Sequence, residues 1–239
     1  MAQKPLAFFH VMKCGGTSVR AGLATGAAGR RHGPEVFELD GSASRVAAGG
    51  TSADEWKFRD ALLPYALLTL QPAIVMGHFR YRDRYEKLFG FAHMVTVLRD
   101  PLERLVSLYK WRRYKPGIDR PVSLGFDELL ASGRWEKAGH DYVDIFCGND
   151  DLDPHSEAAS DAAVANLRRF AVVGFLDRLD EFANHVAACL GKPVTIPMLN
   201  RSPAPDDAEI DPASLERARE LCAPDYRVYD RLLATRVSP

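Results

Sequence analysis

The residues with the clearest chemical use form a run near the N-terminus, Lys-Cys-Gly-Gly-Thr-Ser at 13–18, which follows a short apolar segment. Gly15 and Gly16 allow a tight turn whose backbone N–H groups can approach an anion. A helix that opens at Thr17 or Ser18 adds unpaired N–H groups and hydroxyl donors, and Lys13 adds a full positive charge. The run therefore predicts a site for a phosphate-like anion. An ordinary glycine-containing turn between strand and helix is the alternative.

The order of these residues argues against a nucleoside-triphosphate kinase or hydrolase. A Walker A loop places its lysine after the glycines, whereas Lys13 precedes Gly15 and Gly16. Such enzymes also need carboxylates that hold magnesium, and no strand end in this sequence offers them. We therefore expect a donor anion that transfers its group without a metal ion. A P-loop-like nucleotide kinase is kept as an alternative function.

A second candidate anion site lies at the end of the most β-like segment, 91–98. Arg99 follows this segment, and Ser107 lies on the helix that Pro101 opens. A strand-end arginine and a helix-borne hydroxyl can hold one tetrahedral anion from two sides. Equally open is a structural role for each, in which Arg99 pairs with Asp100 or Glu103 and Ser107 is a small packing residue.

Composition narrows the class of protein. The chain has 239 residues and a formal net charge of -1, with a pI near 6.7. A general nucleic-acid binder would carry a basic excess, so we expect no nucleic-acid partner. No apolar run approaches the roughly 20 residues that span a bilayer, and the N-terminus is typical of a first strand and not of a signal peptide. The four cysteines stand far apart and predict reduced thiols in a cytoplasmic protein.

Short apolar segments alternate with helical patterns along the chain, which predicts an α/β fold. Strands are expected at 6–11, 36–39, 73–76, 91–98 and 171–175. Helices are expected after 17 and after 101, and at 54–63, 126–132, 135–146, 158–169, 179–190, 212–221 and 225–234, while 25–52 is expected to be loop. This alternation favours a central, mostly parallel sheet with helices on both faces. We expect one domain over 1–239.

The two anion motifs together resemble those of the sulfotransferases that use 3′-phosphoadenosine 5′-phosphosulfate (PAPS). The similarity lies in FFHVMKCGGTS and TVLRDPLERLVSLY, and it is closest to the branch of heparan sulfate 2-O- and chondroitin or dermatan sulfotransferases and their bacterial relatives. Further matches are Gly77–His78, FAVVGFLDRLDEF, Asn200–Ser202 and the closing helix around 225–230. The resemblance implies a P-loop-like three-layer fold. Met12 and Cys14 depart from it, because the family usually has proline and threonine there.

The resemblance also assigns roles in donor binding. It implies that the loop binds the 5′-phosphosulfate through Lys13, Cys14, Gly15, Gly16, Thr17 and Ser18, with Cys14 contributing its backbone N–H. Lys13 would in addition stabilise the charge that develops on the bridging oxygen as the product PAP leaves. Arg99 and Ser107 would bind the 3′-phosphate, with Arg201 reaching the same group. No metal is implied.

His78 is the candidate general base for an acceptor hydroxyl, since the resemblance places a catalytic histidine after this strand and imidazole titrates near neutral pH. His10 and His93 are expected to be structural. Arg80, Arg82 and Arg84 alternate after His78 and would share one face of an extended loop, where they could bind an acidic sugar. A solvated basic loop is the alternative. Trp111, Tyr114 and Trp135 would stack on a sugar or, as is more usual, belong to the core.

We therefore expect a PAPS-dependent sulfotransferase that acts on a carbohydrate hydroxyl, in a bacterial cytoplasm. The segments expected to bind the acceptor are 25–71 and 110–161, and neither contains a readable motif. A non-catalytic module that binds PAP or another nucleotide is the alternative from a different class. The sequence leaves the acceptor and the oligomeric state open.

Overall fold

The computed structural model describes residues 4–27, 35–118, 121–199 and 210–235. Within these ranges five strands form one sheet in the order β2-β3-β1-β4-β5. The strands are β1 (Leu6–Phe9), β2 (Val36–Glu38), β3 (Ile74–Gly77), β4 (His93–Leu98) and β5 (Val172–Phe175). Every pairing is parallel. The predicted α/β class with a mostly parallel sheet is therefore confirmed.

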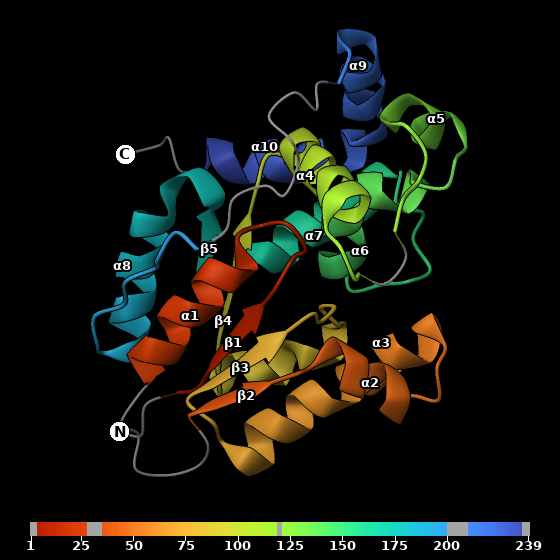
Figure 1. The fold of residues 1–239 in the computed structure, drawn as a ribbon. Helices are drawn as coiled ribbons and strands as arrows, with labels where there is room; N and C mark the ends of the chain where they lie inside the picture. The colour runs from red at the N-terminus through yellow and green to blue at the C-terminus, as the bar shows by residue number, and fades with distance from the viewer. Residues whose placement is uncertain (1–3, 28–34, 119–120, 200–209, 236–239) are drawn as a thin grey trace.

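Helices cover both faces of this sheet (Figure 1). On one face α1 (Gly16–Ala27) and α8 (Leu179–Leu190) pack on Leu6, Phe8 and Val95. The other face is covered by α3 (Ser52–Tyr65), α6 (Asp141–Phe146), α7 (Glu157–Leu167) and α10 (Ala223–Ala234). A third apolar cluster joins α4 (Pro101–Tyr114), α5 (Phe126–Ala131) and α9 (Pro212–Leu221). The three-layer arrangement follows from strands that are apolar on both faces.

Two segments differ from the sequence-based expectation. The stretch expected to be loop contains α2 (Gly41–Ala47), which Asp40 caps by accepting a hydrogen bond from the Ala43 amide at 2.7 Å. The helix expected over 135–146 is interrupted: a 3-10 turn at Glu136–Gly139 precedes α6. A side chain at Gly139 would collide with the Leu221 backbone, because a Cβ there would lie 2.3 Å from its carbonyl oxygen. The close contact between Gly139 and Leu221 in the folded protein therefore accompanies the interruption of the expected helix.

The sheet order brings the carboxyl ends of three strands together. β1 lies between β3 and β4, with Phe9 opposite Gly77 on one side and Thr96 on the other. The segments that follow these strands carry Lys13, His78 and Arg99 respectively. In open α/β sheets ligands bind at this end of the strands, so the fold collects the predicted site residues at one edge. None of the helices within the described ranges is long and apolar enough to span a membrane.

Candidate active site

The turn between β1 and α1 has the backbone shape of an anion-binding loop. Lys13 and Gly15 adopt left-handed conformations, with φ of 66° and 74°. The first helical bond of α1 runs from the Val19 amide to the Gly15 carbonyl at 3.0 Å. The amides ahead of Val19 therefore have no partner inside the helix, and the first turn of α1 carries no acidic residue. This geometry suits an anion.

The two hydroxyls of the loop have different surroundings. Thr17 is exposed, whereas Ser18 is buried with 8% of its surface accessible. The Ser18 hydroxyl accepts a hydrogen bond from the Leu199 amide at 3.2 Å. Its own O–H is left to donate to an anion or to a backbone oxygen. Arg201, predicted to reach the donor, lies outside the described residues.

Cys14 points away from the loop and into the core. Its thiol is buried, and Sγ lies 3.6 Å from the hydroxyl of Tyr142. Its backbone N–H, expected to contact the donor, donates instead to the Val11 carbonyl at 3.3 Å. Burial raises the pKa of the thiol to about 11. A cysteine in place of the family's threonine therefore changes core packing and not the surface offered to an anion.

Tyr142 links the two predicted donor motifs. Its buried hydroxyl accepts from the Arg99 amide at 2.9 Å, donates to the Arg99 carbonyl, and lies against Cys14. The Tyr142 amide in turn donates to the Asp225 carboxylate at 2.8 Å, and Asp225 pairs with the fully buried Arg104. Burial raises the pKa of Asp225 to about 8, although the charge of Arg104 opposes that shift. This network fixes the end of β4 relative to the loop.

Cations converge where the two motifs meet. The Lys13 ammonium lies 5.4 Å from the centre of the Trp111 ring, and the Lys115 ammonium lies 5.8 Å from it. Burial, followed by the charges of Arg99 and Lys115, lowers the pKa of Lys13. Arg99 also forms a partly exposed ion pair with Glu103 at 3.2 Å. The charges of Arg99 and Lys115 thus disfavour the protonated form of Lys13, and an anion bound beside these groups would offset that repulsion.

Ser107 belongs to the same part of the molecule. It lies half-buried on α4, one helical turn before Trp111, and residues with this spacing share a face. Trp111, one of the aromatic residues considered for sugar stacking, is thus a neighbour of Lys13, whereas Trp135 is buried in the third apolar cluster.

His78 directly follows β3, and its tautomer is set by its neighbour His10. Its Nδ1 lies 2.7 Å from the backbone oxygen of His10. A carbonyl oxygen only accepts, so Nδ1 carries the hydrogen and Nε2 of the neutral ring keeps its lone pair. Burial lowers the pKa of His78 below its ordinary value of 6.5. The ring is therefore neutral at pH 7, as a general base must be.

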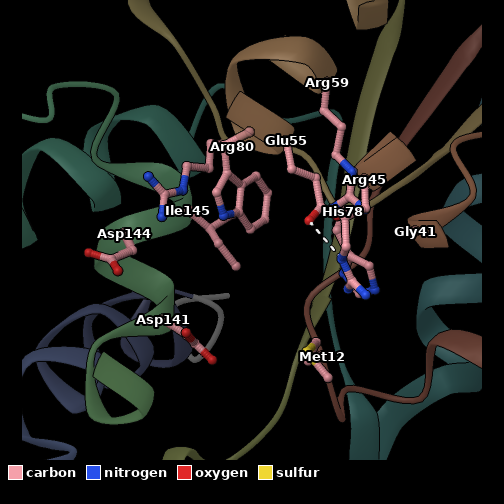
Figure 2. Close-up of a pocket in the computed structure, with 11 residues that line it drawn as sticks. Met12, Gly41, Arg45, Glu55, Arg59, His78, Arg80, Asp141, Asp144 and Ile145 are labelled. Carbon is pink, nitrogen blue, oxygen red and sulfur yellow. Dashed lines mark ion pairs between the residues drawn. The ribbon is translucent and has the colours of Figure 1, made fainter. Parts of the chain in front are cut away.

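His78 opens onto a pocket of about 250 Å³ (Figure 2). Arg80 and Met12 also line the pocket, and α6 contributes one wall through Asp141, Asp144 and Ile145. The remaining wall comes from α2 and α3, through Gly41, Arg45, Glu55, Trp56 and Arg59. Most of the lining thus belongs to the two segments in which acceptor-binding residues are expected.

The three alternating arginines do not share one face. Arg80 lines the pocket, with its guanidinium 4.7 Å from the centre of the Trp56 ring. Arg82 forms ion pairs of 2.6 Å with Asp60 and with Asp150. Arg84 is exposed, because a 3-10 helix begins at Asp83 and ends the extended segment. The expectation of a common basic face for Arg80, Arg82 and Arg84 is wrong for this reason.

The structure adds residues that sequence reasoning did not select. Arg59 is 4% exposed and lines the pocket. Its guanidinium lies 5.5 Å from the centre of the Trp56 ring. Within the described part of the chain, the Nε atoms of Arg59 and Arg80 are buried without a hydrogen-bond partner. One signal was present in the sequence: arginine and tryptophan one turn apart on a helix. Their burial depends on the fold and was not visible.

Comparison with known proteins gives matches to sulfotransferases. No protein-family model matches the chain. Heparan sulfate 2-O-sulfotransferase 1 of Mus musculus and of Homo sapiens are each 32% identical to it over 137 residues, covering 51% of this chain and 38% of theirs. The heparin sulfate O-sulfotransferase of Drosophila melanogaster is 30% identical over 131 residues, covering 48% of this chain and 37% of that protein. The aligned part thus spans less than two fifths of these relatives.

Among solved structures, a sulfotransferase from Alicyclobacillus acidocaldarius aligns with 96% of each chain at 15% identity, with a TM-score of 0.49. A likeness at this level carries no argument. The sequence matches, at 30–32% identity, are to proteins of the kind that the two motifs resemble. Over about half of its length the chain is similar to the heparan sulfate 2-O-sulfotransferases, the branch that the two motifs resemble.

Proposed function

We propose that the protein is a sulfotransferase that transfers the sulfuryl group of PAPS to a hydroxyl of an anionic carbohydrate. The observation that carries the proposal is the state of His78: a neutral imidazole with Nε2 unprotonated, lining a pocket at the same sheet edge as the Lys13 loop. Its supports are the matches named above and the cationic groups Lys13, Arg99 and Lys115, which lie near one another at this edge.

The donor site proposed is built from the loop and the end of β4. The amides of the first turn of α1 and the hydroxyls of Thr17 and Ser18 would hold the 5′ side of the donor. Arg99 and Ser107 would hold the 3′-phosphate, which distinguishes PAPS from ATP. The convergence of Lys13, Arg99 and Lys115, which lowers the pKa of Lys13, is consistent with a ligand of several negative charges.

The reaction proposed is an in-line displacement at sulfur, catalysed by positioning and by charge stabilisation. The acceptor oxygen forms a bond to sulfur while the bond from sulfur to the bridging oxygen breaks. His78 takes the hydroxyl proton at Nε2, and its Nδ1–H stays on the His10 carbonyl. Lys13 stabilises the negative charge that collects on the bridging oxygen as PAP leaves.

The donor is tested by discrimination at the 3′ position. We expect PAP to raise the melting temperature without magnesium and ATP with magnesium to have no effect. Loss of a hydrogen bond to a charged group costs about 1.5–3 kcal/mol, so Arg99→Ala is expected to cut the preference for PAP over 5′-AMP roughly 10- to 100-fold. Arg168→Ala, an exposed arginine at the end of α7, is the matched control. A preference that Arg99→Ala leaves intact contradicts the assignment.

Transfer itself is tested with labelled PAPS and a panel of glycans. Label that appears on a sugar hydroxyl supports the proposal. Tight PAP binding with no transfer to any acceptor would instead identify a nucleotide-binding module without catalysis.

The anionic character of the acceptor is proposed from Arg59 and Arg80. Each has a buried Nε without a hydrogen-bond partner, although the Nη1 atom of Arg80 also lies 3.9 Å from the Asp150 carboxylate. A buried donor without a partner is costly unless a ligand supplies an acceptor atom. A carboxylate or sulfate in the pocket would supply one to each side chain, and both side chains lie near the Trp56 ring. The Glu55 carboxylate, 2.5 Å from the Arg59 guanidinium, keeps Arg59 in place.

We expect Arg80→Met to raise the KM for a carboxylated or sulfated acceptor roughly tenfold or more, because one charge-assisted hydrogen bond is lost. The KM for PAPS and the activity toward a neutral acceptor should not change. Steady-state kinetics with paired acidic and neutral acceptors measure this, with Arg168→Met as the control. An equal loss with both acceptors would show that Arg80 supports the fold and not recognition. Arg59→Met repeats the test at the second arginine of the pocket.

A further inference from the structure

His10 ties the end of β1 to the end of β3 through its backbone. Its N–H donates to the Gly77 carbonyl at 2.9 Å, and its own carbonyl accepts from Nδ1 of His78 at 2.7 Å. The residue therefore occupies the position from which the tautomer of His78 is set. The sequence motifs give His10 no role, since it lies between the strand and the lysine of the loop.

The ring of His10 fills the space between the donor loop and His78. Its plane stacks on the His78 ring, with centroids 4.3 Å apart and 24° between the planes. Phe8 stacks beside it at 5.8 Å and 17°. Gly16, the first residue of α1, lies against its edge, because a Cβ at that position would come within 1.7 Å of Nε2 of His10. One ring thus contacts both the loop and His78.

We propose that His10 is a positioning residue for His78: its ring, packed against Gly16, holds the His78 imidazole in the one orientation that keeps Nδ1–H on the His10 carbonyl and leaves Nε2 free. The proposal rests on the proposed function for the use of that Nε2. The orientation itself is a property of the protein alone.

Two features of the ring support this role. The torsion that turns an imidazole about its last bond is soft, so a hydrogen bond at one nitrogen fixes it poorly without a packed face. A neighbour that became charged would also repel a protonated His78. Burial, the charge of His78 and nearby cations lower the pKa of His10 well below its ordinary value, so this ring stays neutral. The charged groups that face the two rings are Lys13, Arg20, Glu55, Arg59 and Asp141.

The contact with Gly16 extends the consequence to the donor loop. A ring that touches the first residue of α1 cannot tilt without pressing on the anion-binding amides. His78 is therefore aligned against the same element that would hold the donor. Misplacement of a reacting group by about 1 Å costs on the order of 100-fold in rate, so this alignment has catalytic weight.

The test compares His10→Ala, which removes the ring, with His10→Phe, which keeps a flat ring between Phe8 and His78. We expect His10→Ala to lower kcat roughly 10- to 100-fold with little change in the KM for PAPS, and His10→Phe to restore most of the loss. Water that enters beside His78 relieves its burial and raises its pKa, so the acidic limb of the pH–rate profile should move to higher pH in His10→Ala.

Side-chain nitrogen NMR of histidine-labelled protein reads the same effect without any reaction. Wild type and His10→Phe should show His78 as the single Nδ1–H tautomer, and His10→Ala should show a mixture. His93→Ala, at the opposite end of the sheet, is the control for loss of a histidine. Unfolding curves for every variant separate positioning from loss of the fold, and His10→Phe is the decisive variant if His10→Ala does not fold.

The outcomes separate the two proposals. No transfer by the wild type rejects the proposed function, while the NMR comparison still decides the role of His10. An unchanged His78 tautomer in His10→Ala overturns the positioning role. So does a changed tautomer with an unchanged kcat, because the orientation would then have no use in the reaction.

Discussion

His78→Asn is expected to lower the turnover number by about 10²–10⁴, the usual contribution of a positioned general base. The amide of asparagine can still donate a hydrogen bond toward the His10 carbonyl, but it cannot accept a proton at neutral pH. PAP binding should persist, because His78 follows β3, whereas the proposed donor contacts lie on the loop after β1, just after β4 and on α4. Single-turnover transfer checks the loss of turnover, and a PAP thermal shift on the same sample checks that PAP still binds.

The pH dependence gives a second readout of the same residue. The active form of the base is neutral, so the rate falls as the pH drops through the pKa of His78. Burial lowers that pKa below 6.5, and we therefore expect the acidic limb of kcat/KM to lie below pH 6.5. A limb above that value would contradict a buried neutral base.

His93→Asn is the matched control for His78→Asn. It removes a histidine from β4 of the same sheet, at the end away from the loop, where His93 stands opposite Leu6. Its turnover should stay near that of the wild type. Turnover of His78→Asn within a few-fold of wild type would remove His78 from the mechanism.

The sequence predicted the framework of the site because the site lies at strand ends. Apolar segments bounded by glycine or proline indicate buried strands, and in a parallel sheet the residues that follow them share one edge. Lys13 and Arg99 were found in this way, whereas His78 was found through the resemblance, which places a catalytic histidine after its strand. These residues lie close together because β1 lies between β3 and β4. The positions of the strands in the sequence do not determine this order in the sheet.

The walls of the pocket could not be predicted in the same way. α2 lies in a stretch rich in glycine, alanine and serine, whose periodicity is weak, and only the Asp40 cap marks its start. Arg59 has a helical position that alone suggests a solvated charge. Its burial is a consequence of packing against Trp56 and Glu55. His10 needed contact information too, since its partner His78 is 68 positions away in the chain.

Both departures from the family pattern have a place in the structure. Cys14 faces Tyr142 in the core, so its change from threonine does not alter the anion-facing surface of the loop. Met12 packs with the third apolar cluster and also lines the pocket. Of the two departures, Cys14 is thus confined to the core, whereas Met12 is part of the pocket lining.

Lys13→Met is expected to lower kcat by about 10²–10³, the cost of removing one preorganised charge from a developing anion. Methionine keeps a similar length and meets the same left-handed backbone, so the substitution changes charge more than shape. Rapid-quench measurement of a single turnover isolates the chemical step. Lys137→Met, which removes an exposed lysine from a 3-10 turn, is the control and should leave kcat unchanged.

The same substitution should not weaken the free protein. Burial and the charges of Arg99 and Lys115 lower the pKa of Lys13 in the folded state. The unfolded chain therefore binds this proton more tightly, and the protonated lysine opposes folding at neutral pH, an effect that fades as the pH rises through the lowered pKa. We expect Lys13→Met to melt at the same temperature as wild type or higher, and to lose most of the stabilisation that PAP confers. A lower melting temperature together with an unchanged PAP shift would mean that Lys13 supports the fold and takes no part in binding the donor.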